Sequence, residues 1–118
     1  MGRFEVKVKV GNPAHPERSS EVSLLVDTGA TLSWLPRELL KRLGVRAISR
    51  SRFLLPDGRH LERQTAGVLL TVNGSTMSVP VAFAEPGEAT VLGATALEAL
   101  GQAVDPVKQK LVAHDLYI

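Results

Sequence analysis

The chain begins with alternating apolar and charged residues over residues 4–10, the two-residue period of a strand with one buried face. Residues 11–20 are polar and start with Gly-Asn-Pro, so a loop is predicted there. The apolar run at residues 22–26 predicts a buried strand that ends directly at an acidic residue, Asp27. The pattern therefore predicts two strands, the second of which carries a carboxylate at its end.

Two short helices are predicted from leucine spacing and from the residues at their ends. Leucines at helical intervals follow Pro36, which the first turn of a helix tolerates, and Gly44 stands where a helix would end. In the same way, Thr95 is predicted to cap a second helix that Gly101 ends.

Turn-forming residues predict two hairpins in the middle of the chain. One spans about residues 52–67 with Pro56-Asp57-Gly58 at its turn, and the other turns at Asn73-Gly74. Further strands are predicted at residues 32–35, 68–72, 79–83, 90–92 and 111–112. The chain is therefore predicted to be mostly β, with one or two short helices.

A weak internal repeat runs through this pattern. Gly29-Ala30-Thr31 recurs as Gly93-Ala94-Thr95, and Leu43-Gly44-Val45 recurs loosely as Leu100-Gly101-Gln102. Each half reads as a hairpin, a buried strand, a glycine turn and a helix, so the order of elements supports a duplication more strongly than the matching letters do.

Composition narrows the function classes. At 118 residues with 44% apolar residues, the chain has room for one domain, residues 1–118, with one core. A net charge of +2 and scattered arginines do not indicate a nucleic-acid partner. The absence of cysteine excludes disulfides, thiolate catalysis and cysteine-based zinc sites. The three histidines lack ligand-like spacing, so neither a metal nor another cofactor is expected.

The location is predicted to be cytoplasmic. Residues 1–10 alternate in character, unlike a signal peptide, and no apolar run approaches the roughly 20 residues of a membrane helix. No insertion into a membrane is therefore expected.

Asp27-Thr28-Gly29-Ala30 is the segment that carries candidate chemistry. A carboxylate that an apolar strand delivers into a Thr-Gly turn is expected to be buried, and burial of a charge is costly unless the charge has a role. The ordinary alternative is a turn aspartate that caps its own backbone. The four residues alone leave both interpretations open.

The ordered set of motifs resembles the retropepsin-like aspartic proteases, and the small bacterial members more than the viral ones. The resemblance rests on residues 24–30, on Val91-Leu92-Gly93 followed by a helix, and on the hairpin between them, and it covers nearly the whole chain. It implies a closed, barrel-like, mostly β fold with a pseudo-twofold repeat. It also implies a homodimer in which two subunits complete one active site that hydrolyses peptide or protein substrates.

The resemblance assigns roles to individual residues. Asp27 is the expected catalytic carboxylate, which shares one proton with its counterpart in the second subunit and activates a water molecule. The other assigned residues are Thr28, Gly29 and Ala30 in the active-site loop, Leu92 and Gly93 in a second glycine loop, and Leu54, Leu55, Pro56, Asp57, Gly58 and Arg59 in a flap that closes over bound peptide. Trp34 is expected to lie in the core, and the apolar tail at Leu116 and Ile118 either packs at a dimer sheet or frays.

The chain departs from the viral pattern at two places. Thr31 and Ala94 stand where viral enzymes have an acidic residue and an arginine, so recognition of the substrate backbone is expected to differ. The flap turn is polar and charged rather than rich in glycine, which allows a flap that opens further or selects substrates by charge. Alternatives are a catalytically silent peptide-binding or dimerisation module on the same fold, and a monomer that becomes active when a partner pairs two copies.

Overall fold

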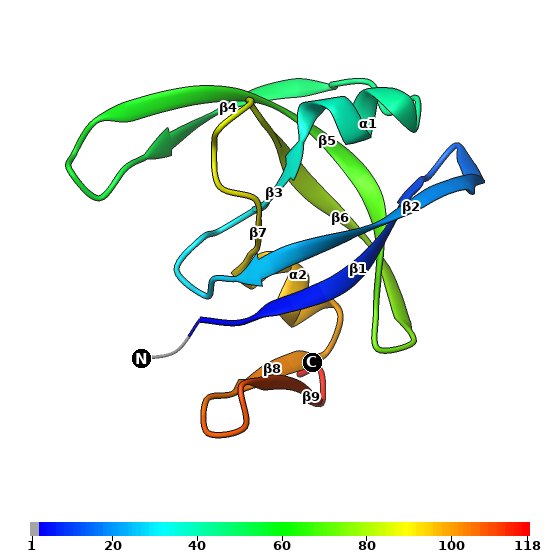
Figure 1. Ribbon diagram of the computed structural model, residues 1–118, viewed down its shortest axis with the longest axis vertical. Coiled ribbons are helices and arrows are strands. Elements are labelled where there is room, and N and C mark those ends of the chain that lie inside the picture. Colours follow the sequence, from blue (N-terminus) through cyan, green and yellow to red (C-terminus); the bar gives the residue numbers. More distant parts are fainter. Residues whose placement is uncertain (1–2) are drawn as a thin grey trace.

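The computed structural model describes residues 3–118 and is built mainly of strands (Figure 1). Its elements, in chain order, are β1 (Glu5–Asn12), β2 (His15–Val26), β3 (Ser33–Pro36), α1 (Arg37–Arg42), β4 (Ser49–Leu54), β5 (His60–Val72), β6 (Ser75–Ala84), β7 (Val91–Leu92), α2 (Ala94–Ala99), β8 (Gln102–Asp105) and β9 (Lys110–Ala113). The expected mostly β fold with two short helices is confirmed.

Seven strands form one sheet in the order β1-β2-β7-β3-β6-β5-β4, and an additional pairing of β1 with β5 closes six of them into a ring. β4 lies outside this ring and pairs with β5 as one arm of the flap hairpin. β8 and β9 make a separate two-stranded ribbon below the ring (Figure 1). The ring satisfies the backbone hydrogen bonds of its strands and leaves β4 as a free edge.

The inner faces of the strands and one face of each helix make a single core. The two-residue period of strands is clearest in β5, where alternate residues from Ala66 to Val72 are buried, whereas the last residues of β1 and β6 are buried in succession. The fully buried side chains include Val8, Val10, Leu24, Leu35, Leu40, Leu70, Val81 and Leu92. The strand that precedes Asp27 is thus anchored in the core through Leu24.

The internal repeat is present in the strand pairings. β2 pairs in parallel with β7 through Leu25 and Val91, and β6 pairs in parallel with β3 through Ala82 and Trp34. The same difference in residue number separates Leu25 from Ala82 and Trp34 from Val91, so one shift along the chain relates the two halves. Trp34 and Val91 also pair antiparallel with each other, where the two halves meet. The same shift takes Leu43 to Leu100, the residue that caps the C-terminal end of each helix. The fold is therefore duplicated about a pseudo-twofold axis.

The Gly-Ala-Thr recurrence does not mark equivalent positions in this repeat. Instead, the two segments touch: the N–H of Ala94 donates to the carbonyl of Ala30 at 2.7 Å, and the N–H of Thr95 donates to the carbonyl of Thr31 at 3.0 Å. The shift that superposes the two halves places the turn after Asp27 opposite residues 85–90 instead. The recurring Gly-Ala-Thr residues are therefore in contact with one another and are not evidence of the duplication.

Two local predictions were wrong. Residues 11–20 form the tip of the β1–β2 hairpin rather than a loop, because β2 already starts at His15 and its polar residues pair with β1 through the backbone. Thr95 does not cap α2. The cap position is Gly93, in extended conformation, and Ala94 is already helical. Thr95 therefore lies inside the first turn of α2, where its N–H bonds to the other half of the chain.

The β1–β2 hairpin also stabilises the end of α1. The side-chain N–H of Asn12 donates to the carbonyl of Leu43 at 2.8 Å, and Arg18 donates to the carbonyl of Arg42 at 2.7 Å. These carbonyls have no partner within the helix, so the hairpin satisfies them. Gly44 follows with φ of +77°, as the sequence predicts for the residue that ends this helix.

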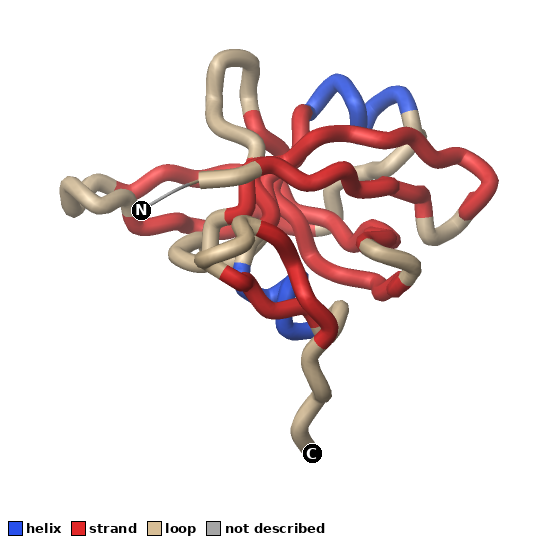
Figure 2. Tube along the Cα trace, turned by 60° about the horizontal axis from the view of Figure 1, so that its bottom comes forward, coloured by secondary structure: helices blue, strands red, loops and turns tan. Residues whose placement is uncertain are grey.

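The chain ends in an exposed tail. After β9, residues 114–118 form no strand in the single chain and run away from the body of the molecule (Figure 2). Leu116, Tyr117 and Ile118 are largely exposed. The alternative of packing at a dimer sheet needs a second copy and stays a prediction.

Candidate active site

The turn after β2 is held from both sides by backbone hydrogen bonds. The N–H of Asp27 donates to the carbonyl of Leu92 at 3.0 Å, which ties the start of the turn to β7. Within the turn, the N–H of Ala30 donates to the carbonyl of Asp27 at 3.2 Å, and the N–H of Gly29 donates to Oδ1 of Asp27 at 2.9 Å. The aspartate therefore caps its own turn, as the ordinary alternative predicted, but with one oxygen only.

The second carboxylate oxygen is available for chemistry. Within residues 3–118, Oδ2 of Asp27 makes no hydrogen bond and no ion pair involves this side chain. Asp27, Thr28 and Gly29 are all exposed in the single chain. The expectation of a buried carboxylate was wrong, because only Leu24 of the preceding apolar run is fully buried and the strand leaves the core at its end.

The second glycine loop packs directly beneath this turn. A Cβ atom on Gly93 would lie 2.6 Å from the carbonyl oxygen of Leu32 and 2.7 Å from that of Ala30, so no side chain fits there. The N–H of Gly93 donates to the hydroxyl of Ser33 at 2.9 Å in a buried contact. The structure thus brings together the two glycine loops that the sequence singled out.

Ser33 is a supporting residue that the sequence analysis missed. Its side chain is fully buried at the start of β3, where it accepts the hydrogen bond from Gly93. A serine between two large apolar residues, Leu32 and Trp34, in a predicted strand is the one available signal, because a hydroxyl that becomes buried needs a partner.

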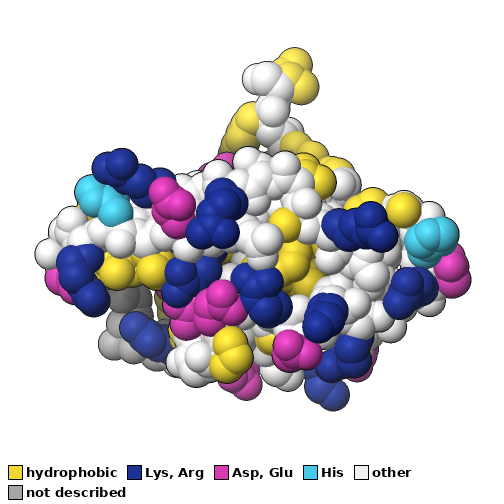
Figure 3. Space-filling model, turned by 90° about the horizontal axis from the view of Figure 1, so that it is seen from above, with side chains coloured by type: hydrophobic (Ala, Val, Ile, Leu, Met, Phe, Trp, Pro, Cys, Tyr) yellow, Lys and Arg dark blue, Asp and Glu magenta, His cyan; other side chains and the backbone are white. Residues whose placement is uncertain are grey.

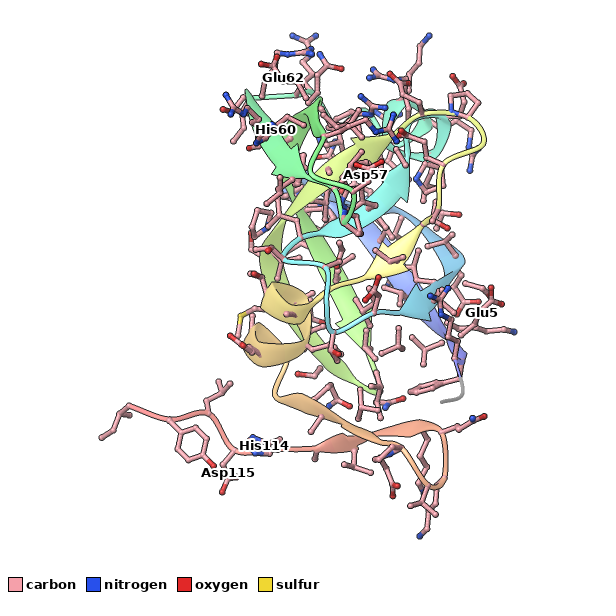
Figure 4. The ribbon with its side chains drawn as sticks, turned by 90° about the vertical axis from the view of Figure 1, so that its left-hand side faces the viewer. Glu5, Asp57, His60, Glu62, His114 and Asp115 are labelled. Carbon is pink, nitrogen blue, oxygen red and sulfur yellow. The ribbon has the colours of Figure 1, made fainter. Side chains whose placement is uncertain are left out.

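The predicted flap is the β4–β5 hairpin, and it projects to the same side as the turn after β2, which is cyan (Figure 1). Its own turn is closed by a hydrogen bond from the N–H of Leu55 to the carbonyl of Arg59 at 2.8 Å. Asp57 lies at the tip, while His60 and Glu62 lie on β5 (Figure 4). The structure places Leu54, Leu55, Pro56, Asp57, Gly58 and Arg59 together at this tip, and Leu54 is 70% exposed.

The flap tip carries its own ion pair. Hydrogen bonds from the backbone N–H and then from the side chain of Arg59 lower the pKa of the Asp57 carboxyl. Both side chains are largely exposed, so the pair shapes the turn more than it stabilises the fold.

Trp34 does not lie in the core, contrary to expectation. It is half-buried on β3, and its ring packs against Phe53 of the flap with centroids 4.9 Å apart. The aromatic pair therefore links the predicted flap to β3, the strand that follows the turn at Asp27.

A charged cluster joins α1 and β5 to the β6–β7 loop, and the sequence analysis did not find it. Arg37 makes two hydrogen bonds to Glu85 and one to Gln64, while Arg63 makes two to Glu88. The hydrogen bond from Arg37 lowers the pKa of Glu85, and that from Arg63 lowers the pKa of Glu88. Three segments far apart in the sequence contribute to it, so no local pattern marks it.

Two cavities lie next to this cluster. One, of about 250 Å³, lies between the start of α1 and the β6–β7 loop, and another, of about 560 Å³, lies between α1 and residues 44–47. Arg37 and Glu38 line both, and Asp27 lines neither. The face that carries α1 and the flap mixes basic and acidic side chains without a continuous basic patch (Figure 3).

None of the helices within residues 3–118 is both long and apolar enough to cross a membrane.

Comparisons with known proteins agree with this geometry. A model of the family described as aspartyl protease matches residues 6–107. Among solved structures, the EIAV protease in complex with the inhibitor HBY-793 superposes with a TM-score of 0.57 at 22% identity, covering 88% of this chain and 93% of that one. The search of curated proteins returned no match. The structural likeness concerns the fold, whereas the family match spans most of the sequence. The chain therefore belongs to the aspartyl protease family, and its fold is retropepsin-like.

Proposed function

We propose that this protein is an aspartic endopeptidase that works as a homodimer, with Asp27 of each copy forming one catalytic dyad. The observation that carries the proposal is the carboxylate of Asp27. One oxygen holds the turn through Gly29, and the other has no hydrogen-bond partner within residues 3–118. The side chain is exposed, and the loop at Gly93 supports the turn from beneath. One chain supplies a single such carboxylate, so a second copy completes the pair.

The chemistry follows from bringing two carboxylates together. Two carboxylates about 3 Å apart cannot both ionise cheaply, so they share one proton and titrate as a pair. The ionised member takes a proton from a water molecule while the water oxygen attacks the peptide carbonyl carbon. The protonated member donates its proton to the carbonyl oxygen. The carboxyl that took the proton from water then donates it to the amide nitrogen as the C–N bond breaks, and the other carboxylate takes a proton from a hydroxyl of the tetrahedral intermediate, so the dyad again holds one shared proton.

The remaining site residues have supporting roles in this proposal. Thr28 hydrogen-bonds across the dimer axis, Gly29 allows close approach of the partner turn and substrate, and Ala30 lines the site. Leu92 and Gly93 hold the catalytic turn from beneath. The flap turn at residues 54–59 closes over an extended peptide and excludes water from the dyad.

The first test compares the parent with Asp27→Asn on a peptide library from acid to neutral pH, with the oligomeric state measured in parallel. Glu21→Gln is the matched control, because it removes an exposed carboxylate from β2, the strand that leads to Asp27, and leaves the tail unchanged. We expect cleavage by the parent and the control only. A parent dimer that binds peptides without cutting them would favour the silent binding module.

Mixing experiments test the shared site. If each site needs Asp27 from both copies, an equal mixture of parent and Asp27→Asn after subunit exchange retains about one quarter of the parent activity. A monomeric enzyme would retain about one half. A parent that is monomeric and inactive, but cleaves when two copies are joined, would favour activation by a partner that pairs them.

A further inference from the structure

The β6–β7 loop is bound to two other elements by a set of ion pairs that the proposed chemistry leaves unused. We call this set the clamp, and its members are Arg37, Arg63, Gln64, Glu85 and Glu88. Arg37 donates to both carboxylate oxygens of Glu85, at 2.7 and 3.1 Å, and to Gln64 at 2.7 Å. Arg63 donates to both oxygens of Glu88, one of them at 3.0 Å.

One end of the clamp is continuous with the strand under Asp27. The loop leads directly into β7, where the carbonyl of Thr90 accepts from the N–H of Leu25 at 3.3 Å. Two residues later, the carbonyl of Leu92 accepts from the N–H of Asp27 at 3.0 Å. A displacement of the loop would therefore be passed to the catalytic turn through β7.

The other end of the clamp is the stem of the flap. Arg63 and Gln64 lie on β5, where Arg63 pairs with Ser51 of β4 across the hairpin. In Figure 1 the yellow loop between β6 and β7 rises to this stem. Arg37 directly follows β3, the strand whose Trp34 packs on Phe53 of the flap.

The geometry of the clamp differs from that of ordinary surface ion pairs. The side chains of Arg63 and Glu88 are 18% and 25% exposed, and the carboxylate of Glu88 also accepts from the N–H of Glu85 at 2.7 Å. The pair Arg50–Glu62 on the same hairpin has a single contact at 3.5 Å, with side chains 59% and 62% exposed. Two-pronged, partly buried pairs fix geometry, whereas loose exposed pairs do not.

The placement of Arg37 supports a role outside its own helix. It is the first residue of α1, where the helix end carries positive partial charge and a cation is disfavoured. Its guanidinium instead points to Glu85 and Gln64 and lies 5.5 Å from the ring centroid of Phe83. The contacts of Arg37 with distant residues therefore explain an arginine at this position, whereas helix formation does not favour one.

We infer that Arg63 and Arg37 are positioning residues that lock the flap stem to the β6–β7 loop, so that the flap and the Asp27 turn hold one geometry around a bound peptide. This inference rests on the proposed peptidase function. Neither arginine touches the reacting atoms. Each acts through Glu88 or Glu85, by way of β7, on the position of Asp27 relative to the flap.

The test is a double-mutant cycle of Arg63→Gln, Glu88→Gln and the double variant, with KM and kcat measured per folded dimer. Loss of the link frees the flap, so we expect KM to rise about tenfold in each single variant and kcat to fall less. The double variant should be no worse than either single one, because all three remove the same link. Unchanged KM, or additive effects in the double variant, would overturn the inference.

Arg50→Gln and Glu62→Gln are matched controls, because they remove an exposed pair from the same hairpin. Both should keep KM within about twofold of the parent, as expected for an exposed pair. A rise in KM as large as that of Arg63→Gln would mean that any charge change on the hairpin acts alike, and would overturn a specific clamp. If Arg63→Gln fails to fold, Arg37→Gln and Arg63→Lys replace it.

A second readout does not depend on catalysis. Trp34 is the single tryptophan of the chain and packs on the flap, so its fluorescence reports the flap position. In an Asp27→Asn background, adding Arg63→Gln should shift the emission of Trp34 to longer wavelength, and adding Arg50→Gln should not. If the parent cuts nothing, the proposed function fails, and the Trp34 emission still tests whether Arg63 holds the flap in place. If the parent cuts but neither KM nor emission changes, the clamp alone is wrong.

Discussion

Two loops in equivalent positions of the duplicated fold differ in whether arginine side chains bind their carboxylates. The turn between β2 and β3 presents Asp27, which has no ion-pair partner within residues 3–118 and keeps one oxygen free. The loop between β6 and β7 presents Glu85 and Glu88, and each is bound by an arginine through two hydrogen bonds. The shift that takes Leu25 to Ala82 places these loops opposite one another.

The difference shows that a loop alone does not determine whether its carboxylate can take part in proton transfer. Arginines that arrive from α1 and β5 hold the pKa values of Glu85 and Glu88 below the usual range and keep both groups ionised. No described residue forms an ion pair with Asp27. One copy of the duplicated loop is thus left free for chemistry, and the other is used to hold neighbouring elements.

The largest expected effect separates the two loops by activity. Asp27→Asn should lower kcat by roughly 10³-fold, the scale of lost proton transfer, whereas Glu85→Gln in the equivalent loop should lower it by at most about tenfold. The measurement is kcat per folded dimer, with circular dichroism as a check of folding. Equal losses in both variants would mean that the loops are not specialised as described.

The next effect separates the two glycines that flank the site. Gly93→Ala should lower the free energy of unfolding by about 1–3 kcal/mol, because the new Cβ would overlap the carbonyl oxygens of Leu32 and Ala30. Gly29→Ala has only Oδ1 of Asp27 near its new Cβ, at 3.3 Å, so it should change stability far less. Urea unfolding of both variants checks the difference, and equal stabilities would contradict it.

A smaller effect tests the hydroxyl beneath the turn. Ser33→Ala leaves the buried N–H of Gly93 without its partner, which should cost about 1–2 kcal/mol of stability. Ser49→Ala, at an exposed serine with a weak 3.5 Å contact, should stay within about 0.5 kcal/mol of the parent. If Ser33→Ala unfolds at the same urea concentration as the parent, the hydroxyl does not support the turn.

The smallest effect is the pH dependence of the clamped loop. The folded pKa of Glu88 is lowered by Arg63, so the stability it adds is complete above the ordinary pKa of glutamate and is lost as pH falls through the lower folded value. The parent should therefore lose stability more steeply than Glu88→Gln in that acid range. Unfolding free energies measured across acid pH compare the two, and parallel curves would contradict the assignment.

Local chemistry made much of the fold predictable. Asn73 and Gly74 have positive φ in the β5–β6 turn, as an Asn-Gly hairpin requires, and Gly44 and Gly101 end the helices with positive φ. The Asp27 turn and the flap also lie where the pattern indicates. The polar residues 11–20 were predicted wrongly, because their pairing with β1 across the hairpin outweighs their turn-like composition.

The sequence by itself determined where the chain turns, where its helices end and which carboxylate stands in a Thr-Gly turn, because these properties depend on residues a few positions apart. Only the tertiary structure decided that Asp27 is exposed, that Ser33 supports the predicted Gly93 loop beneath it, and that Arg37 and Arg63 bind the opposite loop. Those contacts join residues 25–60 positions apart, as between Arg63 and Glu88 or Ser33 and Gly93. Their partners meet only when the ring of strands closes, so no local pattern encodes them.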